Sequence, residues 1–232
     1  RPKVLNALNS TVIEDLREVF TNIREDKRIK GAVLTGFGTR AFVSGADITE
    51  LAALKTPKEG EAFSLRGKEV FDLIEGLGKP VICAMNGLAF GGGCELAMAC
   101  TARIALKGLR VLAGQPEPKL GIIPGYGGTQ RLPRLVGFEN AWEMLRTGNP
   151  VSSQRAREIG LIQKEVERDL LDEAISLTKR AISGEVTLSQ IEKGAIKVPS
   201  SLPEVDIGQL SKKTDELMRL SLIHISEPTR PY

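Results

Sequence analysis

The segment at residues 81–100 constrains the fold more than any other part of the chain. Residues 81–85 (VICAM) form a nearly continuous apolar run, as expected of a strand that is buried on both faces of a sheet. Three consecutive glycines at residues 91–93 then open a helix at residues 94–100. A strand that leads through glycines into a helix is consistent with an α/β fold.

The rest of the chain alternates between helical and strand signals. An amphipathic helix is predicted to begin at the cap residues Asn9 and Ser10. Residues 41–48 are interpreted as a loop that leads into a helix, with Asp47 and Glu50 forming a capping box. Further helices are predicted around residues 63–77, after residues 125–128, and at 152–159 and 170–182; strands are predicted at 30–35, 103–106, 111–113 and near 161–166.

Composition excludes several classes of protein. The 232 residues are 41% hydrophobic and 26% charged with a net charge of +3, which is typical of a globular protein and gives no basic stripe for nucleic acid. We find neither a signal peptide nor an apolar run long enough to span a bilayer, so we expect a cytoplasmic protein with no membrane partner. A targeting segment ahead of Arg1 stays open, because the sequence has no initial Met. The three cysteines fit no zinc pattern and are expected to be reduced structural thiols.

The last residues resemble an artefact of sequencing. Residues 220–230 read LSLIHISEPTR, which is similar to the translation of a common transposase sequencing adaptor. We therefore treat residues 220–232 as adaptor-derived in a metagenomic fragment, the alternative being a natural tail that ends in a turn. The only histidine, His224, falls in this segment, so a Ser-His-Asp triad is excluded.

Two helix starts offer free backbone N–H groups. The first N–H groups of a helix lack intrahelical partners, and glycine lets a ligand approach them closely. The glycines at 91–93 and the loop at 44–47 could therefore each stabilise an anion or a developing oxyanion. The alternative is a tight turn at the glycines and an ordinary capped helix after the loop.

Two carboxylates are candidates for acid–base chemistry. Glu95 lies one turn into the helix after the glycines, and Glu117 lies in Gly114-Gln115-Pro116-Glu117. Two carboxylates that face one water can act as base and acid if the site is dry enough to raise a pKa. The alternative for each is a solvated surface charge. The sequence has no P-loop, HExxH or GxSxG motif that would point to other chemistry.

Together these segments resemble the crotonase (enoyl-CoA hydratase/isomerase) family. The resemblance covers essentially residues 1–219. Four stretches carry it, in the family's order: PKVLNALN at 2–9, AFVSGADI at 41–48, KPVICAMNGLAFGGGCELAMA at 79–99 and GQPEPKLGIIPGYGGTQRLPRLVG at 114–137.

The resemblance implies a fold and an assembly. The family fold is an α/β spiral of ββα units followed by a helical region, so we expect the spiral core at residues 1–138 and a mainly helical region at 139–219. Family members assemble as homotrimers or dimers of trimers. The sequence is interpreted as truncated at both ends relative to the family. The stretch between Cys100 and Gly114 is slightly longer than usual, which could shift Glu117.

The resemblance also implies the site. The N–H groups of Ala46 and Gly92 would form the oxyanion hole for a thioester carbonyl. Residues Ala46, Asp47, Ile48 and Thr49 match the loop that lines the CoA site. Glu95 and Glu117 match the two catalytic glutamates of the hydratases. No metal and no separate cofactor are expected, because CoA is part of the substrate.

The implied reaction is reversible addition of water to a trans-2-enoyl-CoA, giving a 3-hydroxyacyl-CoA in fatty acid β-oxidation. One glutamate would remove a proton from water, while Glu117 would deliver a proton to C2. The alternatives are an enoyl-CoA isomerase, which commonly keeps only the equivalent of Glu117, or another crotonase-type acyl-CoA lyase. A non-catalytic or RNA-binding family member is a third interpretation. The loss of a glutamate, or the presence of a basic face, would favour it.

Overall fold

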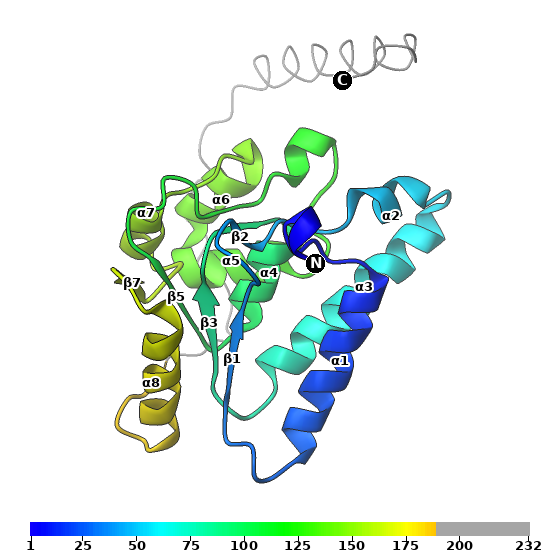
Figure 1. Cartoon of the computed structure of the whole chain (residues 1–232). Coiled ribbons are helices and arrows are strands. Elements are labelled where there is room, and N and C mark those ends of the chain that lie inside the picture. The colour runs from blue at the N-terminus through cyan, green and yellow to red at the C-terminus, as the bar shows by residue number, and fades with distance from the viewer. Residues whose placement is uncertain (189–232) are drawn as a thin grey trace. The chain divides into compact units, whose positions relative to one another are not determined.

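The computed structural model describes residues 1–188 (Figure 1). The segments predicted after residue 188, including the adaptor-like residues 220–232, lie outside the described residues. No helix within residues 1–188 is both long and apolar enough to cross a membrane.

Two parallel sheets form the framework of the described part. The four-stranded sheet has the order β1 (Ala32–Thr35), β3 (Val81–Met85), β5 (Ala102–Leu106) and β7 (Lys164–Val166). The three-stranded sheet has the order β2 (Ala41–Val43), β4 (Leu88–Phe90) and β6 (Ala113–Gly114). All pairings are parallel. The chain therefore adds one strand to each sheet in turn, which confirms the predicted α/β spiral of ββα units.

Helices connect the successive pairs of strands. The helices are α1 (Ser10–Glu25), α2 (Ile48–Ala53), α3 (Pro57–Glu75), α4 (Gly92–Ala99), α5 (Gly128–Val136), α6 (Phe138–Thr147), α7 (Ser153–Glu158) and α8 (Leu170–Ile182), with 3₁₀ turns η1 (Pro2–Val4) and η2 (Glu117–Leu120). In Figure 1, α1 in blue and α3 in cyan lie side by side. The helix α4 follows β4 directly, and all of its residues are buried.

The predicted start of the first helix is confirmed at atomic detail. The side chain of Asn9 accepts a hydrogen bond of 3.0 Å from the N–H of Val12, which satisfies one of the free donors of α1. Ile13 and Phe20 are buried on the face that packs against α3. The predicted strands at 30–35, 81–85 and 103–106, and the helix at 170–182, are likewise present with small changes of bounds.

Two short strands were not predicted from the sequence. Residues 41–43, interpreted as part of a loop, form β2, which corrects that interpretation, and residues 88–90, for which no element was predicted, form β4. Each strand has three residues, which is too short for a period-two pattern to stand out. The predicted strand at 111–113 is shifted, because β6 begins only at Ala113.

The apolar run at 81–85 is buried from both sides, as predicted. Ile82 and Ala84 face a cluster that contains Leu170 and Ala174 of α8, whereas Cys83 and Met85 belong to the larger core. Figure 1 shows α8 running beside this sheet. All three cysteines are buried free thiols, which confirms their predicted structural role.

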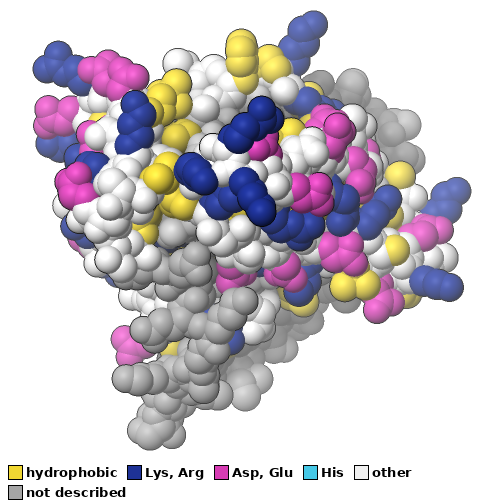
Figure 2. Space-filling view, turned by 90° about the horizontal axis from the view of Figure 1, so that it is seen from below, with side chains coloured by type: hydrophobic (Ala, Val, Ile, Leu, Met, Phe, Trp, Pro, Cys, Tyr) yellow, Lys and Arg dark blue, Asp and Glu magenta, His cyan; other side chains and the backbone are white. Residues whose placement is uncertain are grey.

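Charged side chains of both signs are mixed on the visible surface. In the face shown in Figure 2, lysines and arginines lie among aspartates and glutamates. Among the described residues of that face, acidic side chains interrupt the basic ones, whereas a surface that follows a nucleic acid backbone carries a continuous basic stripe.

Candidate active site

The glycine turn before α4 creates the first part of the site. Gly91 has φ 49° and ψ −122° and is the N-cap residue of α4. A Cβ at Gly91 would lie 2.6 Å from Oε1 of Glu117, so only glycine leaves room for that carboxylate. The turn therefore brings Glu117 to the start of the helix that carries Glu95.

The loop at residues 44–46 lies directly against the glycine turn. A Cβ at Gly45, which has φ +122°, would lie 3.2 Å from the Phe90 carbonyl oxygen. A Cβ at Gly93 would lie only 2.0 Å from the Val43 carbonyl oxygen. Glycine at these positions permits the close contact of the two predicted donor loops.

Leu8 joins the same two loops. Its N–H donates to the Gly45 carbonyl at 2.8 Å, and its carbonyl accepts from the Asp47 N–H at 2.7 Å. Its side chain would contact a Cβ at Gly92 at 3.4 Å. Among the described residues, neither the Ala46 N–H nor the Gly92 N–H donates a hydrogen bond to another group. Both predicted oxyanion donors are therefore unused and lie in adjacent loops.

Glu95 is almost completely buried and firmly held. It projects from the first turn of α4 and is 1% exposed. Its Oε1 accepts from the Tyr126 N–H at 2.8 Å and from the Gly128 N–H at 2.7 Å. Burial raises the pKa of this carboxyl to about 7; the Glu117 charge adds to the rise, while the two N–H donors and Arg131 oppose it.

Glu117 is the second buried carboxylate. It begins the 3₁₀ turn η2 after Pro116 and is 8% exposed. Burial raises the pKa of its carboxyl to about 7. When the Gln115 amide is assigned with its nitrogen toward this carboxylate, it donates to Oε2 at 3.0 Å and to Oε1 at 3.1 Å.

Gln115 links the two glutamates in space. Its side chain is fully buried. A Cβ at Gly128 would lie 2.8 Å from the Gln115 amide and 3.0 Å from Oε1 of Glu95. The other side of this amide faces Glu117, so the structure places both predicted carboxylates around one buried amide. This position of Gln115 was not predicted from the sequence, although the residue lies within the GQPE motif.

The longer stretch before Gly114 does not displace Glu117 from the glycine turn. The N–H of Gly91 donates to the Gly114 carbonyl at 2.9 Å, and Gly114 pairs with Phe90 in the small sheet. Residues 107–111, within the stretch predicted to be longer than usual, form a turn in which Gly108 has φ +80°.

The predicted CoA loop is partly exposed, and its capping differs from the prediction. The Asp47 carboxylate caps α2 by accepting from the Thr49 N–H at 3.0 Å, and it pairs with Arg1 at 2.8 Å. These contacts, the Thr49 hydroxyl first, lower the pKa of Asp47 to about 2. The capping box is wrong, because Glu50 instead accepts from the N–H and hydroxyl of Ser10, each at 2.8 Å. Ile48 is 68% exposed.

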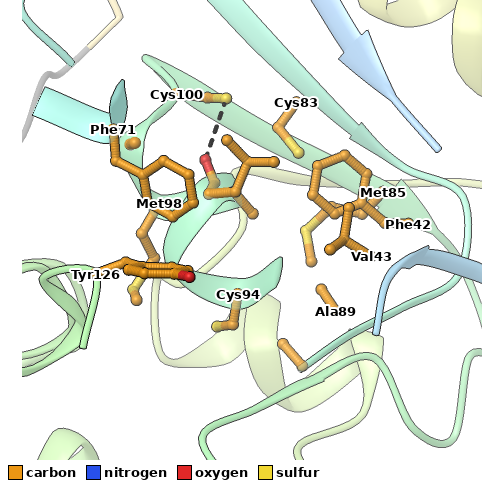
Figure 3. Close-up of a cluster of buried hydrophobic side chains, with 14 of the residues drawn as sticks. Phe42, Val43, Phe71, Cys83, Met85, Ala89, Cys94, Met98, Cys100 and Tyr126 are labelled. Carbon is orange, nitrogen blue, oxygen red and sulfur yellow. Dashed lines mark hydrogen bonds between the residues drawn. The ribbon is translucent and has the colours of Figure 1, made fainter. Parts of the chain in front are cut away.

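Tyr126 forms one wall of the glycine turn. Its ring packs against Phe71 at 5.3 Å with an interplanar angle of 77°. Figure 3 shows this pair at one side of the buried cluster that also contains Cys94 and Met98. A Cβ at Gly67 would fall 2.4 Å from the ring, so the glycine in α3 makes room for it. The place of Tyr126 beside the candidate site was not predicted from the sequence.

The raised pKa of Glu95 predicts a pH-dependent cost in stability. The pKa of Glu95 rises from its ordinary 4.5 to about 7 on folding. The contribution of this carboxyl to the free energy of unfolding is therefore fully present below pH 4.5 and is lost as the pH rises through 7. Glu95→Gln removes this titration. We expect the variant to gain up to about 3 kcal/mol in free energy of unfolding over the wild type between these pH values. Denaturant unfolding at several pH values measures this, and a difference that is independent of pH would contradict it.

The geometry defines a class of protein: an α/β spiral that brings together two buried carboxylates and two backbone N–H groups that have no acceptor within residues 1–188. A family model described as enoyl-CoA hydratase/isomerase matches residues 1–214. The chain belongs to the enoyl-CoA hydratase/isomerase family.

Named relatives are similar over most of the chain. The short-chain-enoyl-CoA hydratase of Clostridium acetobutylicum is 44% identical over 197 residues, which is 84% of this chain and 74% of that protein. The crotonyl-CoA hydratase of Syntrophomonas wolfei is 42% identical over 196 residues, with the same coverage of 84% and 74%. Among solved structures, the enoyl-CoA hydratase of Bacillus anthracis matches with a TM-score of 0.73 at 32% identity, covering 100% of this chain and 92% of that one.

Proposed function

We propose that this protein is an enoyl-CoA hydratase that adds water reversibly to a trans-2-enoyl-CoA. The observation that carries the proposal is the pair of buried glutamates, Glu95 and Glu117, whose pKa values are both raised to about 7 around one buried amide. A carboxyl with a pKa near the working pH can both accept and donate a proton. The names of the Clostridium and Syntrophomonas relatives support the same activity.

The N–H groups of Ala46 and Gly92 are proposed to bind the thioester oxygen. Within residues 1–188 neither N–H group donates a hydrogen bond, and the two lie in loops that contact each other. Gly92 is the first residue of α4, so the positive end of that helix adds to its attraction for an oxyanion. Polarisation of the thioester would make C3 electrophilic and stabilise the enolate-like transition state.

The two carboxylates are proposed to act as the general base and the general acid. Glu95, ionised, takes a proton from water as the water oxygen bonds to C3. The π electrons of the double bond move to the thioester, and Glu117, protonated, delivers a proton to C2. The product is the 3-hydroxyacyl-CoA. Proton exchange between the two carboxyls through the next water would restore the starting state.

The loop at residues 46–49 is proposed to hold the CoA portion. Asp47 anchors this loop to Arg1 and to the start of α2, while Ile48 presents an apolar side chain to solvent. An acyl-CoA thioester is thus the proposed substrate, with no separate cofactor. Within residues 1–188 no three His, Cys, Asp or Glu side chains are grouped as metal ligands would be.

A homotrimer or dimer of trimers is the proposed assembly. Three apolar side chains near Glu117 are unusually exposed: Leu120 at 61%, Ile122 at 45% and Ile123 at 77%. Exposed apolar side chains gathered in one segment are typical of a surface that another molecule covers.

The assay must separate the hydratase from the isomerase alternative. The purified protein is given crotonyl-CoA, and loss of the ultraviolet absorbance of the conjugated enoyl thioester is followed. In parallel it is given a 3-enoyl-CoA, whose conversion would raise that absorbance. We expect hydration of crotonyl-CoA to dominate, because Glu95 is retained, buried and held by two N–H groups. Isomerisation without hydration would favour the alternative and contradict the proposal.

A further inference from the structure

A buried arginine lies behind the loop that holds Glu95. Arg131 is in the first turn of α5 and is 4% exposed. Its Nη1 donates to the Tyr126 carbonyl at 2.8 Å. The same nitrogen would lie 2.4 Å from a Cβ at Gly127, so the guanidinium folds back closely over this loop.

Two acidic residues of α3 fix the guanidinium from the other side. Its Nε donates to Glu75 Oε2 at 2.9 Å, and its Nη2 donates to Asp72 Oδ1 at 2.7 Å. A buried cation is costly unless it is paired and hydrogen-bonded. Here the guanidinium donates to acceptors on three different residues at once. On the same helix, the Ser64 hydroxyl donates to the Gly125 carbonyl, which ties the preceding part of the loop to α3.

The loop at residues 126–128 connects Arg131 to the carboxylate of Glu95. The N–H groups of Tyr126 and Gly128 both point at one oxygen of Glu95. The carbonyl of the same Tyr126 is the group that Arg131 holds. A continuous series of contacts therefore runs from α3 through Arg131 and the loop to the candidate base.

We propose that Arg131 is a positioning residue for the hydration reaction, acting through the loop at residues 126–128 to fix the carboxylate of Glu95. The inference rests on the proposed function and names a residue that no substrate atom needs to touch. Its planar guanidinium suits this role, because it can donate in several directions at once, as a lysine ammonium cannot in the same geometry.

The charge of Arg131 also acts on Glu95 directly. It lowers the pKa of that carboxyl against the larger effect of burial. Removing the charge should raise the pKa of Glu95, so the ionised base would form only at higher pH. The charged and titratable groups around Glu95 are Cys94 on α4, Glu117 on η2, Tyr126 before α5 and Arg131 on α5, with Asp72 and Glu75 of α3 behind the arginine.

The test compares Arg131→Met and Arg131→Lys with a control on the same helix. For Arg131→Met we expect kcat to fall roughly 10²-fold, the scale of a misplaced catalytic group, with KM almost unchanged. The acid limb of its kcat/KM profile should move to higher pH. Arg131→Lys keeps the charge, so its acid limb should stay near that of the wild type while kcat falls less. Arg134→Met is the control, because Arg134 is half-buried and, within residues 1–188, its side chain bonds to Gln130 alone.

Two results would overturn the inference. One is a wild-type kcat with an unshifted acid limb in Arg131→Met, measured beside an active wild type. The other is an unchanged Glu95 titration in ¹³C-labelled protein, a readout that does not require turnover. If the wild type itself fails to hydrate crotonyl-CoA, the proposed function fails instead. If Arg131→Met does not fold, Glu75→Gln replaces it, because this variant weakens only one contact of the guanidinium. A kcat below that of the wild type with unchanged KM then supports the inference, and a wild-type kcat opposes it.

Discussion

Glu95→Gln and Glu117→Gln are each expected to lower kcat by roughly 10²–10⁴-fold, the range of a general acid–base group. Glutamine keeps the size of the side chain and the oxygen that accepts from Tyr126 and Gly128, but it can neither take nor release the proton. Substrate binding should survive, because neither carboxylate is proposed to hold CoA. Steady-state kinetics with crotonyl-CoA separate the two effects.

A surface variant controls for general damage. Glu143 lies on α6 and is exposed, and its carboxylate pairs with Arg146 alone in the described part of the chain. Glu143→Gln should retain the wild-type kcat. Turnover close to wild type in either Glu95→Gln or Glu117→Gln would show that the corresponding carboxylate is not part of the chemistry.

Gly92→Pro is expected to lower kcat by roughly 10²–10³-fold, because it removes one backbone donor from the proposed oxyanion hole. The helix itself should tolerate the change. Gly92 is the first residue of α4, where proline is accepted because that N–H has no intrahelical partner. The variant thus removes the donor without removing a bond that holds α4 together.

Gly92→Ala is the matched control for the added bulk. A Cβ at this position would lie 3.1 Å from the Tyr126 ring and 3.4 Å from Leu8, so a small adjustment is needed in both variants. The alanine retains the N–H. We expect Gly92→Ala to be much more active than Gly92→Pro, and equal activity of the two would contradict the role of the N–H.

The sequence predicts the long elements of this fold better than the short ones. The helix after Asn9 and the strand at 81–85 carry strong local signals, namely a cap with helical spacing and a continuous apolar run. The three-residue strands β2 and β4 are specified by pairing with each other, which no local pattern records. Glu50 satisfies the local rule for a capping box, yet it binds Ser10, 40 residues away.

The candidate site, like the fold, can be predicted from the sequence only in part. Glu95 and Glu117 are candidates from their motifs, but each alone is indistinguishable from a surface charge in sequence. Their environment depends on contacts between distant segments: Gly91 lies against Glu117, and Gly128 lies against Glu95 and Gln115. The role of Arg131 is not readable locally, because its partners Asp72 and Glu75 are 59 and 56 residues away in the chain.

Product analysis in D₂O tests the central claim most directly. Crotonyl-CoA is incubated with the purified protein in D₂O, and the product is examined by NMR and mass spectrometry after short and long times. If the two glutamates split one water across the double bond, the early product is 3-hydroxybutyryl-CoA with a single deuterium at C2. Recovery of unreacted crotonyl-CoA, or of a product whose double bond has moved, would contradict the account.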